Sequence, residues 1–243
     1  MKTVILAAGA GSRLKPLTDH LPKCLLKASG KSILEMTIEN LLETGNSEII
    51  IVTGYLENTI REYIRNRFPQ LKVTFIVNRS YTSTNNIYSL WLAKDEVMGD
   101  DMLMMDSDII FDKSIITRLQ ASGYKNCLAL KRHDVNEEEI KVRADETGRV
   151  IEIGKNVKTA DAAGESIGIE IFGKEILTEL FGIIDRMVVT EKKVNAFYEA
   201  AFQELADKKN DLFVVDTTEY LCMEIDTKED LITADELIFN YYK

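Results

Sequence analysis

The stretch that decides the fold lies near the start of the chain and reads Leu6-Ala7-Ala8-Gly9-Ala10-Gly11-Ser12-Arg13, with Pro22-Lys23 following it. It comes directly after an apolar segment, Thr3–Ala7, that is typical of a buried β-strand. Glycine lets the backbone turn tightly and bring its N–H groups close to phosphate oxygens, an approach that a Cβ would obstruct. Because Arg13 and Lys23 add positive charge, the stretch predicts a loop that binds the phosphates of a nucleotide.

Two other glycine-rich phosphate motifs fit this stretch less well. The Walker loop needs Gly-Lys-Ser/Thr at a fixed offset after its glycines, and this chain lacks it. The dinucleotide fingerprint needs a third glycine where this chain has Leu14, and Pro16 and Pro22 oppose the helix that should follow. A NAD- or FAD-dependent oxidoreductase is therefore disfavoured, and a titration with NADH would test that alternative.

The distribution of charge supports a local anion site rather than a basic surface. The chain has a net charge of −10, which argues against nucleic acid or an anionic membrane as a partner. Residues 1–31 are the exception, because six lysines and arginines there face Asp19 alone, which gives a net charge of +5. A solvated basic patch would have the same composition, but the neighbouring glycines favour anion binding.

Size and cysteine content set the broad class. A chain of 243 residues with 45% hydrophobic residues predicts one domain, 1–243, with a sizeable core. Cys24, Cys127 and Cys222 lie far apart without metal-ligand spacing, so we expect buried, reduced thiols and a cytoplasmic protein. The sequence shows neither a signal peptide nor a membrane span, and it does not indicate the oligomeric state.

Alternating strand and helix patterns predict an α/β fold with a mostly parallel sheet flanked by helices. The predicted strands of the first half are Thr3–Ala7, Glu48–Thr53, Lys72–Val77, Asp101–Met105 and Asn126–Leu130. The predicted helices between them are Ser32–Glu43, with a serine cap, Leu56–Arg67 and Ile87–Val97.

The pattern changes after residue 131. Glu139–Ala144 and Val150–Ile153 predict a β-hairpin with a glycine turn, and Ser166–Phe172 a further strand. The later elements are predicted to be the helices Lys174–Arg186 and Asn195–Lys208, the strands Leu212–Val215 and Leu221–Ile225, and a terminal helix near Lys228–Tyr242. We interpret residues 132–210 as a smaller portion inserted before the chain returns to the sheet.

Two acidic pairs follow predicted strands. Asp106 and Asp108 come after the predicted strand Asp101–Met105, and on an ideal strand both side chains point the same way. Glu224 and Asp226 lie where the predicted strand Leu221–Ile225 ends, shortly before the terminal helix begins. Ligands of open α/β sheets bind at this edge, where carboxylates can hold a metal against phosphates. The same residues would also suit a turn or a helix cap, with Asp226 or Thr227 as the cap of the last helix.

The stretch from Leu6 to Arg13 with Pro22-Lys23 resembles the signature of the nucleotidyltransferases that make sugar nucleotides and CDP-alcohols, and every fixed position is met. The resemblance implies a Rossmann-like fold with a smaller acceptor-binding insertion, here 132–210. It also implies transfer of a nucleotidyl group from an NTP to a phosphorylated acceptor with loss of pyrophosphate. Arg13 and Lys23 would be the catalytic cations. Mg2+ would be held by Asp108 and Asp226, with Asp106 and Glu224 in support.

A second resemblance concerns the substrates. Residues 78–90, with Asn85-Asn86-Ile87-Tyr88-Ser89-Leu90, are similar to a run in phosphocholine and 2-aminoethylphosphonate cytidylyltransferases, which points to CTP. Asparagine amides can read a pyrimidine edge, although a helix cap would look alike. The predicted nucleotide-binding residues are therefore Leu6, Ala7, Ala8, Gly9, Ala10, Gly11, Ser12, Asn78, Asn85 and Asn86.

For the acceptor, we expect Lys155 to bind its phosphate or phosphonate and Glu165 its ammonium group. Tyr198 and Glu199 would complete a cationic pocket, because ammonium groups favour aromatic faces beside carboxylates. Ordinary core or surface roles fit these residues as well. Trp91 is the only tryptophan and belongs to the nucleotide half, so no full choline cage is visible.

Other acceptors, and a function without turnover, stay open. The acceptor could be a primary amine, an inositol phosphate or a sugar 1-phosphate, the last used with UTP or dTTP. A nucleotide-sensing subunit without turnover would show a broken metal pair, whereas here Asp108 and Asp226 are both present. His20 and His133 show no partner pattern that would favour a catalytic dyad.

Overall fold

Four parallel strands form the centre of the protein in the computed structural model, which describes residues 1–241 apart from the side chains of residues 239 and 240. They are β1 (Lys2–Ala7), β4 (Ile49–Thr53), β5 (Val73–Val77) and β6 (Met102–Asp106), in the order β6-β1-β4-β5. Each was predicted to within a residue at either end. The near-continuous apolar run of β1 and β4 fits strands that are covered on both faces.

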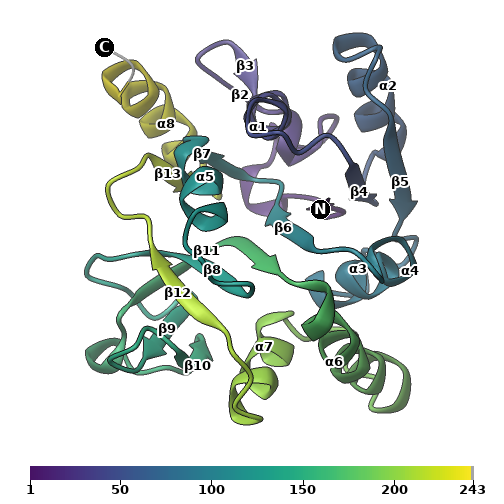
Figure 1. Cartoon of the computed structure of the whole chain (residues 1–243). Helices are drawn as coiled ribbons and strands as arrows, with labels where there is room; N and C mark the ends of the chain where they lie inside the picture. Colours follow the sequence, from purple (N-terminus) through teal and green to yellow (C-terminus); the bar gives the residue numbers. More distant parts are fainter. Residues whose placement is uncertain (242–243) are drawn as a thin grey trace.

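The sheet continues beyond β6 with antiparallel strands (Figure 1). The long strand β11 (Gly164–Phe172) pairs with β6 and also with β8 (Cys127–Lys131) and β9 (Lys141–Ala144). The predicted hairpin is confirmed, since β9 pairs antiparallel with β10 (Val150–Gly154) through a turn in which Gly148 has φ +84°. The chain returns in β12 (Phe213–Asp216), parallel to β8.

Helices cover both faces of the sheet. One face packs against α1 (Ile33–Glu43), α2 (Glu57–Arg67) and α5 (Ser114–Gln120), and the other against α3 (Asn86–Leu92), α6 (Lys174–Asp185) and α7 (Glu199–Asp207). The Ser32 hydroxyl caps α1 by accepting the Glu35 N–H, as predicted. The expected helix Ile87–Val97 is instead two helices, because the chain is interrupted at the buried Ala93 before α4 (Lys94–Val97).

The second predicted helix of the insertion is shorter than expected. α7 begins at Glu199, four residues later than the apolar pattern indicated, and α6 gives way to a wider π-helical turn over Arg186–Thr190. The remaining short helical turns are Ser12–Leu14, Lys23–Leu25 and Thr159–Asp161.

Two small sheets lie beside the terminal helix. β7 (Ile109–Phe111) pairs antiparallel with β13 (Cys222–Glu224), and β2 (Lys27–Ala28) pairs with β3 (Lys31–Ser32). The terminal helix α8 (Lys228–Tyr241) packs over them around an apolar cluster that includes Leu26, Ile110 and Ile225. The predicted last residue of this helix, Tyr242, lies outside the described residues.

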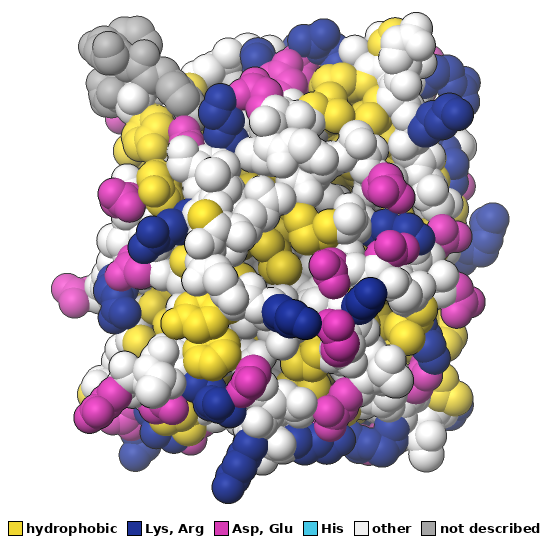
Figure 2. All heavy atoms as spheres, in the orientation of Figure 1, with side chains coloured by type: hydrophobic (Ala, Val, Ile, Leu, Met, Phe, Trp, Pro, Cys, Tyr) yellow, Lys and Arg dark blue, Asp and Glu magenta, His cyan; other side chains and the backbone are white. Residues whose placement is uncertain are grey.

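The three cysteines are buried and unpaired, as predicted. Burial raises the pKa of Cys24 and of Cys222 to about 12, so these thiols stay protonated and inert. Within residues 1–241, no helix has the length and apolar character that crossing a bilayer requires. On the face that Figure 2 shows, Lys and Arg side chains are interspersed with Asp and Glu side chains.

Candidate active site at the carboxyl edge of the sheet

A cleft of about 450 Å³ opens where the parallel strands end. The loops after β1, β5 and β6 meet there because parallel strands place their carboxyl ends at one edge of a sheet. The chain near β13 closes the cleft from the other side. Its lining includes Leu6, Ala7, Ala8, Gly9, Gly11, Ser12, Arg13, Lys23, Asn78, Tyr81, Asn85, Asn86, Asp106, Ser107, Asp108, Glu224 and Asp226.

The loop after β1 lies along one wall, and all of its predicted nucleotide-binding residues except Ala10 line the cleft. Gly11 has φ +59°, a conformation that favours glycine, and a Cβ there would lie 3.1 Å from Cβ of Lys23. The Thr18 hydroxyl donates to the Gly11 carbonyl oxygen at 2.8 Å and holds the turn closed. A Cβ at Gly9 would meet no protein atom within 4 Å, so this glycine leaves open space facing the cleft.

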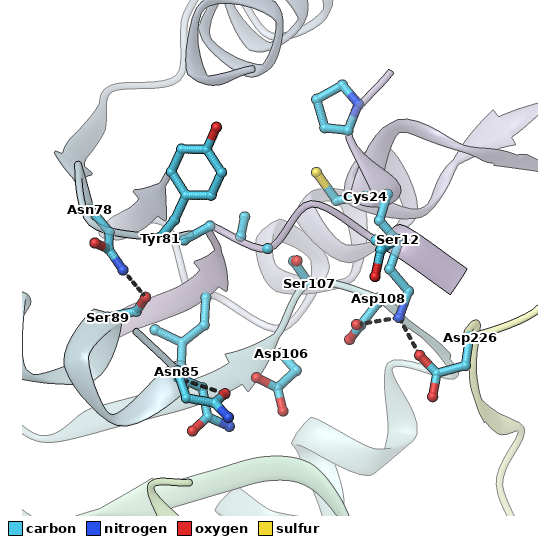
Figure 3. Close-up of a pocket in the computed structure, with 18 of the residues that line it drawn as sticks. Ser12, Cys24, Asn78, Tyr81, Asn85, Ser89, Asp106, Ser107, Asp108 and Asp226 are labelled. Carbon is cyan, nitrogen blue, oxygen red and sulfur yellow. Dashed lines mark hydrogen bonds and ion pairs between the residues drawn. The ribbon is translucent and has the colours of Figure 1, made fainter. Parts of the chain in front are cut away.

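Lys23, Asp108 and Asp226 meet at one end of the cleft. The Lys23 ammonium donates to Oδ2 of Asp108 at 2.6 Å and to Oδ1 of Asp226 at 2.7 Å (Figure 3). Arg13 pairs with the same Asp226 oxygen at 2.6 Å, from a largely exposed position. Burial alone would lower the pKa of Lys23, but its contacts with Asp108 and Asp226 outweigh that and raise it. The amine therefore stays charged.

The pairing of β7 with β13 brings the two aspartates together. Asp108 directly precedes β7, and its carbonyl oxygen accepts the Ile225 N–H at 2.9 Å, which sets Asp226 beside it. Thr227 and Asp230 cap α8, since Asp230 accepts the Thr227 N–H and Thr227 accepts the Asp230 N–H. Because Thr227 is the cap, the carboxylate of Asp226 is left to face the cleft.

A third carboxylate, that of Glu224, completes this end of the cleft. Carboxylate oxygens of Asp108, Glu224 and Asp226 lie within 4.8 Å of one another. Partial removal from water, together with the charges of Asp108 and Asp226, raises the pKa of Glu224 to about 8, although the residue keeps an exposed surface. Closely spaced carboxylates are the ligands that Mg2+ prefers, so the donor set fits that ion.

Asp106 faces another direction, contrary to the prediction that its side chain parallels that of Asp108. β6 ends at Asp106, so Ser107 and Asp108 belong to the following turn and the alternation of a strand no longer applies. The Tyr198 hydroxyl donates to Oδ2 of Asp106 at 2.7 Å, whereas Asp108 contacts Lys23.

Asn78 and Asn85 lie at the opposite end of the cleft from Asp108 and Asp226 (Figure 3). Asn78 is buried and its amide nitrogen donates to the hydroxyls of Thr84 and Ser89 at 3.1 Å. Asn85 caps α3 with its side-chain oxygen, and Asn86 accepts the Tyr198 N–H at 2.9 Å. The helix-cap alternative therefore holds for Asn85. Among the described residues no partner contacts the amide nitrogen of Asn85 or Asn86, so these donors can face a ligand.

The four predicted acceptor-binding residues separate into two groups. Lys155 pairs with Glu138 at 3.0 Å and lies over the Phe197 ring, and Glu165 contacts His133 at 3.0 Å; neither lines the cleft. Tyr198 and Glu199 are buried behind Asp106. Tyr198 is thus a core residue whose hydroxyl reaches the site. No spacing in the sequence indicated the contact of His133.

Sequence reasoning missed Tyr81 and Ser107 as residues of the cleft. Both lie in loops that follow parallel strands, Tyr81 after β5 and Ser107 after β6. The rule that ligands bind at the carboxyl ends of such strands was the available signal for them.

Similar proteins of known activity share this architecture. Residues 2–234 match the family described as nucleotidyl transferase. A CTP:phosphoglutamine cytidylyltransferase of Campylobacter jejuni is 28% identical over 95% of this chain and 98% of its own length. A choline-phosphate cytidylyltransferase of Streptococcus pneumoniae is 27% identical over 99% of both chains.

A solved structure supports the same conclusion for the fold. The CTP:phosphocholine cytidylyltransferase from Streptococcus pneumoniae superimposes with a TM-score of 0.82 and 24% identity over 98% of both chains. A family match over nearly the whole chain, together with a cleft built from the signature loop, identifies the chain as a member of the nucleotidyl transferase family.

Proposed function

We propose that this protein is a cytidylyltransferase, which transfers CMP from CTP to a phosphorylated or phosphonylated amino-alcohol and releases pyrophosphate. The observation that carries the proposal is the convergence of Lys23, Asp108 and Asp226 beside the glycine turn of the signature loop. Relatives that align over nearly the full chain are named for CTP and for phosphoglutamine or choline phosphate, which supports the choice of substrates.

The reaction needs positioning and charge neutralisation rather than a nucleophile from the protein. An oxygen of the acceptor phosphate or phosphonate attacks the α-phosphorus of CTP. The bond from that phosphorus to the bridging oxygen breaks, and pyrophosphate leaves. Arg13, Lys23 and the N–H groups of the loop after β1 would hold the triphosphate and neutralise the charge of the departing pyrophosphate.

We propose that Asp108 and Asp226 hold Mg2+, with Glu224 near enough to serve as a further ligand. The ion would supply positive charge to the phosphates when bound. Lys23 pairs with both aspartates in the free protein, so its ammonium would need to exchange partners from carboxylate to phosphate as the nucleotide enters. Its stem is held by packing against Gly11, which keeps the amine at this end of the cleft.

The asparagine end of the cleft is the proposed place for the base. Donors from Asn85 and Asn86 face a cleft whose opposite end carries the cations, so a nucleotide that lies along it would place phosphates at Lys23 and base at the asparagines (Figure 3). An amide can donate to the acceptors of a cytosine edge.

Pyrophosphate release tests the proposal. The protein would be assayed with Mg2+ and CTP, UTP, dTTP, ATP or GTP, each crossed with phosphocholine, 2-aminoethylphosphonate, inositol 1-phosphate and hexose 1-phosphates. We expect CTP with an amino-alcohol phosphate or phosphonate to give the highest kcat/KM. A preference for UTP or dTTP with a sugar phosphate would overturn the cytidylyl assignment, and absence of turnover with every pair would favour a sensing subunit.

A further inference from the structure

A group of buried acids lies behind the floor of the cleft, on the side away from Lys23. It consists of Asp106, Glu170, Tyr198 and Glu199, and we call it the acid cluster. Glu170 and Tyr198 are each 1% exposed and Glu199 is 7% exposed. Asp106 alone of the four lines the cleft and so connects the acid cluster to it.

Three elements assemble the acid cluster. Asp106 ends β6, and the antiparallel neighbour β11 places Glu170 opposite Met104 on the same face. Gly168 of β11 has φ +70°, and a Cβ there would lie 2.8 Å from Oδ2 of Asp106, so the glycine provides the space that this carboxylate occupies. Tyr198 and Glu199 come from the start of α7, which the Asn86 side chain anchors through the Tyr198 N–H.

The carboxylates of the acid cluster lack the partners that buried acids normally have. Oε2 of Glu170 and Oε2 of Glu199 are buried without a hydrogen bond among the described residues. No lysine or arginine of residues 1–241 forms an ion pair with Asp106, Glu170 or Glu199. The Tyr198 hydroxyl donates to Asp106 at 2.7 Å, and the Ser166 hydroxyl donates to Oε1 of Glu170 at 3.4 Å. Buried polar groups are nearly always satisfied, because an orphaned one is costly.

The electrostatics of the acid cluster agree with a missing cation. Removal from water raises the pKa of Glu170 well above its ordinary value, and the charges of Asp106 and Glu199 add to that effect. Burial raises the pKa of Glu199 to about 7. A bound cation would reverse both shifts by favouring the ionised carboxylates.

The hydrogen-bonding character of the acid cluster restricts which cation fits. It presents oxygen acceptors, while the Tyr198 ring is packed at 5.1 Å against the Phe202 ring and offers its hydroxyl rather than its face. The Trp91 ring packs at a tilt against Tyr88, with ring centroids 5.2 Å apart, and its indole N–H donates to Asp185, so it is engaged elsewhere. A quaternary ammonium has no N–H group and is recognised by aromatic faces, whereas a primary ammonium has three donors.

We propose that the acid cluster binds a primary ammonium group of the acceptor and selects it over a quaternary one, with Glu170 and Glu199 as specificity-determining residues. This inference rests on the proposed function, in which the acceptor is a phosphorylated or phosphonylated amino-alcohol. The primary ammonium reaches the acid cluster past Asp106, and the phosphate or phosphonate of the acceptor is directed toward the α-phosphorus of CTP, opposite the pyrophosphate that Lys23 and Arg13 hold. Glu170, an acidic residue within an otherwise apolar strand, would thus bind the ammonium group.

A methylation series tests the selection in the wild-type protein. With CTP and Mg2+, kcat/KM would be measured for 2-aminoethyl phosphate, its N-methyl and N,N-dimethyl forms, phosphocholine, and amine-free propyl phosphate. We expect kcat/KM to fall with each lost N–H, by at least about tenfold from the primary amine to phosphocholine, because each loss leaves a carboxylate unpaired. Phosphocholine turned over as well as the primary amine would overturn the inference.

Two neutral variants test the residues. Glu170→Gln and Glu199→Gln should raise KM for 2-aminoethyl phosphate about tenfold and leave propyl phosphate unchanged, because only the amine uses the charge. Glu204→Gln, a change of a half-buried acid on the same helix α7 that pairs with Arg186 and does not line the cleft, is the matched control and should leave the kinetics with both acceptors unchanged. Equal losses for both acceptors would mean a merely structural role and would contradict the inference.

The outcomes separate this inference from the function on which it rests. If no acceptor yields pyrophosphate with CTP, the proposed function is wrong and the inference falls with it. If CTP is used but propyl phosphate or a hexose 1-phosphate matches the amine, nucleotidyl transfer stands and ammonium selection is refuted. The methylation series needs no variant, so it decides the question even if Glu170→Gln fails to fold.

Discussion

The two sides of the cleft treat buried charge in opposite ways. On the side of Lys23, each aspartate has a cationic partner, because Lys23 bridges Asp108 and Asp226 and Arg13 joins the latter. In the acid cluster, Glu170 and Glu199 keep carboxylate oxygens without a partner in the described chain. On the proposals above, the cations of the first side would exchange carboxylates for phosphates, and the second side would receive the ammonium of the acceptor. A site of this kind would suit an acceptor that carries an anionic and a cationic end.

The largest effect on activity is expected when an aspartate of the Lys23 side is replaced. Asp108→Asn and Asp226→Asn should each lower kcat/KM by about a thousandfold or more, because a positioned charge at the phosphates is lost. Steady-state pyrophosphate release with CTP measures this. Asp216→Asn, an exposed change on β12, is the control that should leave turnover unchanged. Magnesium-dependent activity retained by either cleft variant would refute the role of that residue.

Removal of the bridging cation should have the next largest effect. Lys23→Met keeps the stem that packs near Gly11 but leaves Asp108 and Asp226 facing each other without the ammonium. We expect kcat/KM to fall about 300-fold, because the triphosphate loses its buried cation. Lys15→Met is the control, because the exposed Lys15 amine pairs with Asp19, and it should leave kcat/KM near the wild-type value. A Lys23→Met protein with normal kinetics would contradict the account of this side.

The buried carboxylate of Glu199 in the acid cluster should make the stability of the protein depend on pH. The pKa of Glu199 is about 7 in the folded protein against 4.5 for the free residue, so from pH 4.5 to 7 the unfolded chain releases a proton that the folded protein keeps. The free energy of unfolding therefore falls across that window. Glu199→Gln lacks this loss and should be more stable by about 3 kcal/mol at pH 8 and under about 1 kcal/mol at pH 5.

Urea unfolding at the two pH values measures the difference, with Glu204→Gln as the control on the same helix. A Glu199→Gln variant that is less stable than the wild type at pH 8 would show that the carboxylate already has a partner. The acid cluster would then resemble the Lys23 side rather than differ from it.

The smallest predicted effect concerns the space beside Asp106. Gly168→Ala should cost about 2 kcal/mol, because the residue has φ +70° and its Cβ would press on Asp106 and Ile109. Gly45→Ala has a similar φ of +81° but no atom within 4 Å of its Cβ, so it should cost about 1 kcal/mol from the backbone alone. Thermal denaturation of both variants measures how much of the loss of stability comes from contact with Asp106 and Ile109. An equal loss in the two variants would show that these side chains move aside without a measurable loss of stability.

Much of the fold was predictable because its signals are local. The apolar runs of β1 and β4 and the glycine turn at Gly148 depend on neighbouring residues, and the structure has them where they were expected. The interruption at Ala93 was not predictable in this way, because an uninterrupted apolar pattern runs through it. There the packing of two short helices outweighs helical periodicity.

The residues of the site also differ in whether local sequence could predict them. The loop from Leu6 to Arg13 was legible because its glycines and cations are contiguous. The meeting of Asp108 with Asp226 depends on the pairing of β7 with β13, so resemblance to a family suggested it where local pattern could not. Glu170 could not be predicted as a functional candidate from the sequence, because it is a single acid in an apolar strand and its neighbours come from β6 and α7.

The most direct test of the central claim is a competition between nucleotides. The wild-type protein would be incubated with Mg2+, 2-aminoethyl phosphate and an equimolar mixture of ATP, GTP, CTP, UTP and dTTP, and the products identified by mass spectrometry. The account predicts a CMP conjugate of the acceptor as the principal product, formed together with pyrophosphate. A principal product that carries UMP or dTMP, or an acceptor left unchanged while every nucleotide persists, would contradict it.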